Sequence, residues 1–175
     1  MAPLKRSVLG GTDLLCQGGV MAASSIRFVS LLLTSLLVGA MFGIWLGFNP
    51  SALTATAYVE TQQNAIRALN TSLPALGLVC ILLTAALAVL TKNDKRGRYL
   101  LVVAAICLAM AGLVTRFGNQ PINALVITWS PEAPAANWME LRDIWWHWHI
   151  LRTVAGVAAL ALALLAALGG QRDSS

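Results

Sequence analysis

The side chains best suited to chemistry gather between residues 116 and 152 of a chain otherwise rich in Leu, Ala and Val. This stretch holds five of the six Trp, both His and two of the three Glu. At about 100° per residue, four of its side chains share one face of a helix: Arg142, Trp145, His149 and Arg152. An aromatic wall beside a basic pair suits a flat, oxygen-bearing aromatic ligand.

The nearest counter-charge for this basic face is Glu60. His149 and Arg152 stand at the threshold of an apolar segment, where an ionisable group is costly unless it faces a cavity or a partner. We therefore predict that Glu60 contacts His149 or Arg152 across the mouth of a helical bundle. The alternative is that its own segment presents an ordinary solvated polar face, made by Thr56, Glu60, Gln63, Asn64 and Arg67 at helical spacing.

Amide side chains are further candidates for ligand contacts. Asn119 and Asn123 flank Pro121, which lacks a backbone donor and biases Gln120 away from helix. Both Asn side chains could satisfy local backbone groups, or Asn123 could orient a carbonyl or enolate oxygen. Together with Gln63 and Trp145, they complete our predicted substrate-binding set.

The elements that must position these residues are membrane spans. A hydrophobic share of 58% with only 11% charged residues indicates an integral membrane protein. Four apolar runs are long enough to cross a bilayer core: residues 26–48, 72–90, 99–115 and 150–168. The apolar sequence from Pro121 to Trp129 either lengthens the third run or re-enters the membrane. We predict an all-α four-helix bundle with helical segments outside the membrane between spans one and two and between spans three and four.

The distribution of basic residues predicts the orientation of the chain. Lys5, Arg6 and Arg27 lie before or at the start of the first span, and residues 91–98 between the second and third spans hold four more basic side chains. Because short cytoplasmic loops collect Lys and Arg, both termini are expected in the cytoplasm, across a bacterial inner membrane. The net charge of +5 is explained by this topology and by anionic lipid, so no nucleic-acid partner is expected.

Domain boundaries follow from the spans. Residues 26–170 are expected to form one membrane domain, and residues 171–175 a short tail. Residues 1–25 are expected to be a disordered or weakly ordered tail, because Gly and Ser dominate their end.

Small residues in the first span suggest close helix packing. Gly39, Gly43 and Gly47 lie four residues apart, and the fourth span has a matching series of alanines. Such spacing lets two backbones approach closely in lipid. The two helices are therefore expected to meet inside one bundle or across a homo-oligomer, although alanine is also simply abundant here.

Several of these motifs resemble those of a known family. They are the pattern N-x-P-I-N at residues 119–123, Trp138, and W-x-x-W-H-x-x-R at residues 145–152, at the start of the last span. With V-E-x-x-Q at residues 59–63, they are similar to small four-span membrane proteins that include the anthrone oxygenases of aromatic polyketide pathways. The resemblance implies a helical bundle and, for the named members, oxidation of an anthrone to an anthraquinone by molecular oxygen without an established organic cofactor.

The resemblance also suggests a mechanism. An anthrone is acidic at the carbon opposite its carbonyl, so a base can generate an anion that reacts with oxygen directly. His149, oriented by Glu60, or Glu60 itself, would remove the proton. Arg152 and Asn123 would stabilise the oxyanion, and Trp145 would stack on the rings.

Two alternatives remain at this stage. A metal ion or haem could be held by His149 and Glu60, but His147 and His149 are two residues apart and point to different helix faces. The chain could instead be a non-catalytic subunit of a larger membrane complex, or bind a quinone, lipid or other hydrophobic small molecule without turnover. Transport is disfavoured, because the spans contain no charge apart from Arg152 near one end and Arg27 at the start of the first span.

Overall fold

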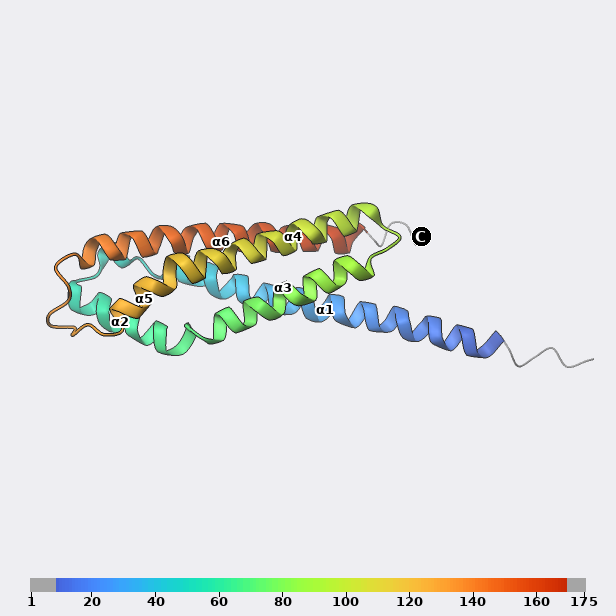
Figure 1. Ribbon diagram of the computed structural model, residues 1–175, viewed down its shortest axis with the longest axis horizontal. Helices are drawn as coiled ribbons and strands as arrows, with labels where there is room; N and C mark the ends of the chain where they lie inside the picture. Colours follow the sequence, from blue (N-terminus) through green and yellow to red (C-terminus); the bar gives the residue numbers. More distant parts are fainter. Residues whose placement is uncertain (1–8, 170–175) are drawn as a thin grey trace, which may run out of the picture.

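The computed structural model describes residues 9–169, and this part of the chain is helical with no β-strand, which confirms the all-α fold. Its helices run in the order α1 (Leu9–Gly47), α2 (Ala55–Leu69), α3 (Ser72–Leu90), α4 (Lys95–Val114), α5 (Gln120–Val126) and α6 (Trp138–Gly169) (Figure 1). Short helical turns lie at Pro50–Ala52 (η1) and Thr115–Asn119 (η2).

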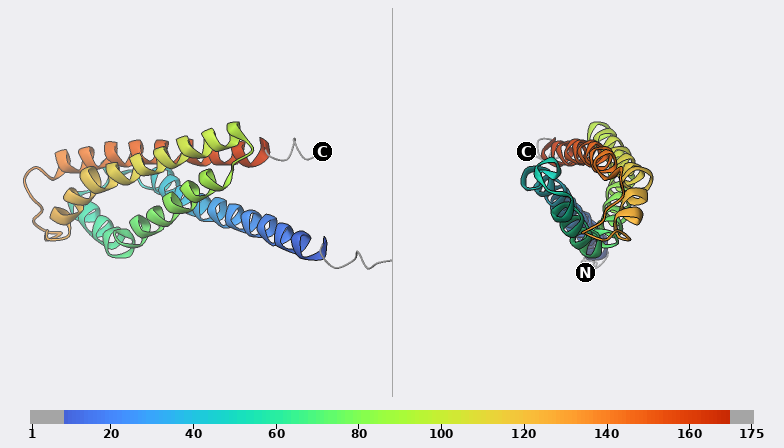
Figure 2. Two further views of the ribbon diagram at one scale, coloured as in Figure 1. Left: turned by 45° about the vertical axis from the view of Figure 1, so that its right-hand side comes forward. Right: turned by 90° about the vertical axis from the view of Figure 1, so that its left-hand side faces the viewer.

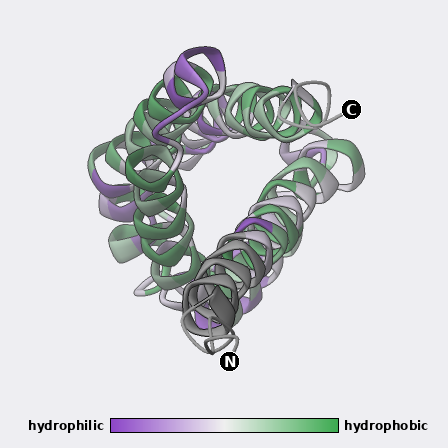
Figure 3. Ribbon diagram, turned by 90° about the vertical axis from the view of Figure 1, so that its right-hand side faces the viewer, coloured by the Kyte–Doolittle hydropathy of each residue, from purple (hydrophilic) through white to green (hydrophobic). Residues whose placement is uncertain are grey.

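Four long helical segments are apolar enough to cross a bilayer: Ser24–Ala52, Ser72–Leu90, Lys95–Val126 and Trp138–Gly169. The helix α6 packs along α4 and α1, and α3 packs against α1 and α4, which closes the bundle (Figure 2). Small and apolar side chains fill its centre, among them Met41, Cys80, Leu108 and Ala159. Exposed Leu, Val and Phe side chains cover the outside. The spans are hydrophobic along most of their length (Figure 3). A surface of this kind is stable in lipid, so the chain is a membrane protein.

The N-terminal part of α1 extends beyond the predicted span. The helix α1 begins at Leu9 and so includes residues 9–25. The disordered or weakly ordered tail expected over residues 1–25 stays a prediction. The leucine, valine and alanine residues between positions 14 and 23 favour this extension. Residues 1–8 and 170–175, which include the predicted C-terminal tail, lie outside the described residues.

The third span continues through Pro121, although the sequence predicted a departure from helix at Gln120. Gln120 is helical, and its amide donates to the carbonyl of Thr115, five residues earlier. This is the wider spacing of a π-turn, over Thr115–Asn119. Because proline lacks an N–H and crowds the preceding turn, a wider turn lets the helix pass it without breaking. The span is therefore lengthened by α5, one of the two outcomes expected for this segment.

The predicted packing of the first-span glycines inside the bundle is wrong for this chain. The helices α1 and α6 do meet, with Ala159 and Ala163 of α6 buried. Gly39, Gly43 and Gly47 lie on the opposite, outward face of α1, and a Cβ added at any of them would meet nothing within 4 Å. Larger side chains of α1, such as Met41, make the contact with α6 instead.

Candidate functional site

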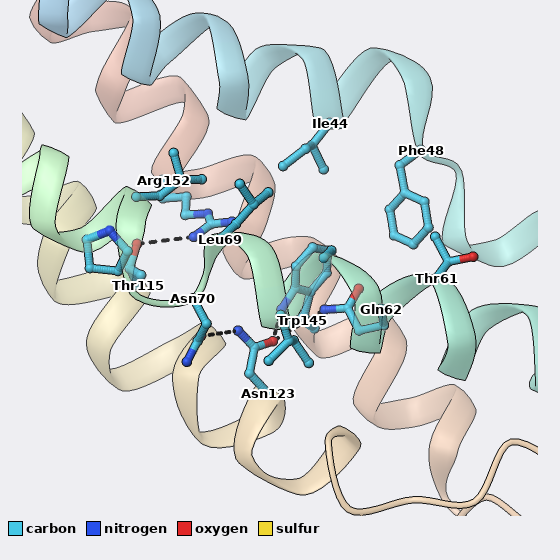
Figure 4. A pocket seen from close by; sticks show the side chains of 14 residues that line it. Ile44, Phe48, Thr61, Gln62, Leu69, Asn70, Thr115, Asn123, Trp145 and Arg152 are labelled. Carbon is cyan, nitrogen blue, oxygen red and sulfur yellow. Dashed lines mark hydrogen bonds between the residues drawn. The ribbon is translucent and has the colours of Figure 1, made fainter.

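A hollow of about 220 Å³ lies beneath α2, at the end of the bundle where α1, α3, η2, α5 and α6 converge (Figure 4). We call it the arginine pocket. Its wall is mainly apolar, with side chains such as Ile44, Phe48 and Leu69, and it carries a few polar groups. These polar side chains come from four different elements and the α2–α3 connection: Thr61, Gln62, Asn70, Thr115, Asn123 and Arg152. A small polar set on an apolar wall is typical of a small-molecule site.

Arg152 is the only charged side chain on this wall, and it is 8% exposed. Its Nη1 donates to Oγ1 of Thr115 at 3.4 Å, its other hydrogen bonds are to His149, and its guanidinium lies over the Trp145 ring at 6.0 Å. In the part of the chain that the structure describes, the one side-chain ion pair joins Arg142 to Asp143, so Arg152 has no carboxylate partner. A guanidinium has five N–H groups, and three donate here, which leaves two for a ligand. A buried cation without a counter-charge favours an anionic ligand.

His149 is fully buried between Arg152 and α1. Its Nε2 lies 3.1 Å from the carbonyl oxygen of Met41, and its Nδ1 accepts from Nε and Nη2 of Arg152 at 3.2 and 2.9 Å. A carbonyl only accepts, so Nε2 carries the proton and the ring is neutral. The lone pair of Nδ1 is already engaged by Arg152. His149 therefore has no nitrogen free to remove a proton from a ligand, contrary to the predicted role as base, and it anchors the guanidinium instead.

Aromatic rings form the floor of the site. Trp145 and His149 stack with ring centroids 5.2 Å apart and planes at 4°, and Trp146 stacks on the same imidazole at 5.5 Å. Phe48 meets Trp145 edge to face at 6.3 Å. The prediction that Trp145 shares a buried face with Arg142, His149 and Arg152 is confirmed, and His147 is exposed. One face of Trp145 is thus covered by the imidazole, and the indole is held rigidly at the pocket wall.

Asn123 joins three elements at the pocket. Its Oδ1 accepts from Nε1 of Trp145 at 2.8 Å and from Nε2 of Gln62 at 3.3 Å, and its Nδ2 donates to Oδ1 of Asn70 at 2.8 Å. This network fixes the indole, α2 and the start of α3 relative to α5. The Oε1 of Gln62 and the Nδ2 of Asn70 make no hydrogen bond within the described residues, so Gln62 can accept from a hydroxyl and Asn70 can donate to a hydroxyl or keto oxygen.

The predicted contact of Glu60 with His149 or Arg152 is wrong. Glu60 is exposed on α2, does not line the pocket and forms no ion pair within the described residues. The buried face of α2 is made by Tyr58, Val59, Gln62 and Gln63. Glu60 directly follows Val59, and the step of about 100° per residue turns its side chain out of this face. The polar face of α2 is therefore an ordinary solvated surface, as the alternative interpretation predicted, except that Gln63 is buried.

Gln63 and Asn119 lie near the pocket without lining it. Gln63 donates from Nε2 to the carbonyls of Val126 and Trp129, at 3.0 and 2.8 Å, which ties α2 to the end of α5. Asn119 donates to the carbonyl of Trp145 at 3.0 Å and is fully buried in the π-turn. Their hydrogen bonds give them structural roles, whereas Asn123 and Trp145 of the predicted set do line the pocket.

Sequence reasoning missed Gln62, Asn70 and Thr115 of this wall. Thr115 is placed by the π-turn, and the proline at position 121 was the signal for an irregular helix there. Gln62 lies on the buried face of α2, next to Gln63, which helical spacing had singled out. Asn70 directly follows the last residue of α2, where helical spacing gives no signal.

The described residues offer little to a metal ion or haem. They contain no group of three His, Cys, Asp or Glu side chains placed to hold a metal. His149 has both ring nitrogens engaged, and Glu60 points away from it. This donor set does not fit the metal or haem site considered from the sequence.

These features define a small α-helical membrane protein with four spans and an internal, cation-bearing pocket of ligand size. Residues 63–162 match the anthrone oxygenase family, and the chain belongs to that family. The match covers more than half of the chain and includes the pocket residues of η2, α5 and α6, whereas Glu60 precedes it. No curated protein and no solved structure matches the chain.

Proposed function

We propose that this protein is a membrane-bound, anthrone oxygenase-like oxidoreductase that oxidises a flat, hydrophobic aromatic substrate with molecular oxygen in the arginine pocket. The observation that carries the proposal is the buried guanidinium of Arg152 on the wall of the arginine pocket, which has no carboxylate partner and two N–H groups without a hydrogen bond within the described residues. Membership of the anthrone oxygenase family supports it. A substrate that becomes an anion during the reaction supplies the missing counter-charge.

The reaction uses Arg152 to stabilise that anion. With the carbonyl oxygen of an anthrone hydrogen-bonded to the guanidinium, loss of a proton from the opposite carbon gives an enolate whose oxygen lies against the positive charge. Such stabilisation in a dry site is worth about 3–4 kcal/mol for a single donor. The enolate carbon transfers electrons to oxygen and forms a C–O bond. The resulting peroxide takes a proton back to become a hydroperoxide. Its O–O bond then breaks as the distal hydroxyl leaves with the second C–H hydrogen as water, which creates the second carbonyl, so one anthrone and one O₂ give one anthraquinone and one water.

The proton is taken up by water or hydroxide at the pocket. No carboxylate lines the arginine pocket, and the imidazole of His149 is already hydrogen-bonded at both nitrogens. Arg152 therefore acts by making the substrate more acidic, since stabilising the charged form lowers the pKa of a bound acid. Gln62 and Asn70 orient phenolic or keto oxygens at the opposite edge of the ring system.

The pocket lies on the non-cytoplasmic side in this proposal. The basic connection between α3 and α4, with Lys92, Lys95, Arg96 and Arg98, is at the other end of the bundle from α2 and α5 (Figure 1). The positive-inside rule then places both termini in the cytoplasm, across a bacterial inner membrane. Membrane lipid and a hydrophobic small molecule are the proposed partners, and neither nucleic acid nor an organic cofactor is invoked.

Oxygen uptake with purified protein in lipid nanodiscs tests the proposal. The substrate is 1,8-dihydroxyanthrone, with empty nanodiscs subtracted for spontaneous oxidation. We expect turnover by the wild type and a loss of about 10²–10³-fold in kcat for Arg152→Gln. Arg96→Gln, which removes the same charge from an exposed site at the other end of the bundle, is the matched control and should keep wild-type turnover.

Two results contradict the proposal. One is oxygen uptake by the wild type no faster than by empty nanodiscs. The other is equal turnover of the Arg152→Gln and Arg96→Gln variants. Binding of the anthrone without turnover would instead support the second candidate, a non-catalytic membrane protein that binds a hydrophobic ligand. The exposed glycine face of α1 offers such a protein a surface for joining a larger assembly.

A further inference from the structure

A second hollow of about 220 Å³ lies between α3 and α4 and meets the arginine pocket at Arg152. We call it the lateral pocket. The two hollows share Leu73, Pro74, Thr115 and Arg152, so the guanidinium stands at their junction. The rest of the lateral pocket is almost wholly apolar, and the mechanism above gives it no role.

The lateral pocket opens towards lipid. Leu78 lies on its wall and is 58% exposed on the outer face of α3. The neighbouring exposed side chains of α3, such as Val79 and Leu82, are hydrophobic as well. Two of its wall residues are glycines on facing helices, Gly77 of α3 and Gly112 of α4. A Cβ at Gly112 would lie 3.9 Å from Cδ1 of Ile81, and one at Gly77 would lie 3.8 Å from Cδ2 of Leu37. The opening therefore has room for one added methyl group without strain, but a larger side chain would narrow it.

The rim of the lateral pocket carries a second cation. Arg116 and Gln120 of the π-turned segment lie on the wall, joined at 3.5 Å from Nη1 to Oε1. A molecule moving inward from the rim passes from Arg116 over the apolar wall to Arg152.

We infer that the lateral pocket is the entrance through which the flat, acidic aromatic substrate passes from the bilayer, between α3 and α4, to Arg152. This inference rests on the substrate class of the proposed function. An apolar polycyclic compound concentrates in lipid, and a route from the lipid side spares it transfer through water. The competing route starts from the water side, past the exposed Thr61 of α2, which lines the arginine pocket.

Stopped-flow binding of anthracene-9-carboxylate to the full chain in nanodiscs tests this inference without turnover. The probe is flat and anionic, and it accepts excitation energy from nearby Trp, so binding is followed by its emission. Gly112→Leu narrows the opening at a position where the backbone has space. Gly43→Leu makes the same change on a span face where an added Cβ meets nothing, and it is the matched control.

We expect Gly112→Leu to slow both association and dissociation at least tenfold, because a narrowed entrance obstructs both directions, while Kd changes less than threefold. Gly43→Leu should stay within twofold of the wild type. Leu78→Trp, on the exposed rim, is the second variant if Gly112→Leu does not fold, and it should show the same pattern.

Two results overturn the inference: equal rates for Gly112→Leu and Gly43→Leu, or a wild type that does not bind the probe. A raised Kd with an unchanged association rate in Gly112→Leu also overturns it, because it marks the lateral pocket as part of the bound position and not as the route. Oxygen uptake is a separate measurement, so a wild type that binds the probe through this entrance and leaves anthrone unoxidised contradicts the proposed function only.

Discussion

Arg152 donates to Nδ1 of His149 from both Nε and Nη2, at 3.2 and 2.9 Å, three residues apart on α6. The other nitrogen of the same imidazole binds the Met41 carbonyl at 3.1 Å. The histidine is therefore a neutral link between the backbone of α1 and a buried cation. This relationship explains how an arginine without a carboxylate partner is held at one position, and it assigns His149 a positioning role.

A double-mutant cycle on this pair measures that role. His149→Ala should lower kcat with an anthrone, because the guanidinium loses its anchor. Adding His149→Ala to Arg152→Gln should then lower kcat by no more than about twofold further, since residues acting through one another are not additive. His149→Gln, which can still donate to Met41, should recover part of the activity. Independent, multiplying losses in the double variant would show that His149 acts on the substrate directly.

Asn123→Ala should weaken the pocket end of the bundle. It removes the acceptor of the Trp145 and Gln62 donors and the donor to Asn70. A partner left without its hydrogen bond costs about 1–3 kcal/mol, so the free energy of unfolding should fall by that amount and KM should rise. Denaturant titration in detergent, followed by Trp fluorescence, measures the change. Asn64→Ala on the exposed face of α2 is the control, and an equal loss there would contradict the assignment.

Gly118→Ala should destabilise the contact between η2 and α6. An added Cβ would lie 2.6 Å from ring carbons of Trp148, which forces the indole or the backbone to shift. Overpacking of this kind costs about 1–3 kcal/mol. Gly39→Ala, where a Cβ meets nothing within 4 Å, should change stability by less than about 1 kcal/mol. Thermal unfolding of both variants in the same detergent tests the difference, and equal midpoints would be inconsistent with the close approach at Gly118.

Tyr58→Phe should be neutral or stabilising at pH 7. Tyr58 is fully buried on α2, its ring is 5.8 Å from that of Trp138, and its hydroxyl has no partner within the described residues. Removing an unsatisfied buried hydroxyl is worth about 1 kcal/mol. Exposed Tyr99 is the control position, where Phe should change little.

The same residue predicts a dependence on alkaline pH. Burial raises the pKa of the Tyr58 phenol above its ordinary value, although the nearby Arg142 opposes this shift. The folded state thus keeps the neutral phenol while an unfolded tyrosine ionises near pH 10. The stability linked to this group is complete below about pH 10 and declines as pH rises beyond it. Unfolding midpoints of the wild type should fall above pH 10, and those of Tyr58→Phe should fall less. A parallel fall in both proteins would argue against this linkage.

The amino-acid sequence by itself determined the membrane bundle. Long apolar runs must form helices in lipid, where each backbone group needs an internal partner, so spans such as Ser72–Leu90 could be placed from composition. Helical spacing likewise predicted that Trp145, His149 and Arg152 share a buried face. The motifs at residues 119–123 and 145–152 pointed to the family that residues 63–162 match.

Only the tertiary structure decided which side chains meet. The rotation of α2 about its axis buries Gln62 and leaves Glu60 exposed, because contacts with α5 and the start of α6 select the face, and these contacts lie far away in sequence. The π-turn that begins at Thr115 brings the hydroxyl of this residue to Arg152, which is 37 residues away in the sequence. The tautomer and role of His149 depend on the carbonyl of Met41 in α1, which is 108 residues away in the sequence. Local periodicity fixes a helix face, whereas the partner of that face depends on how the helices pack.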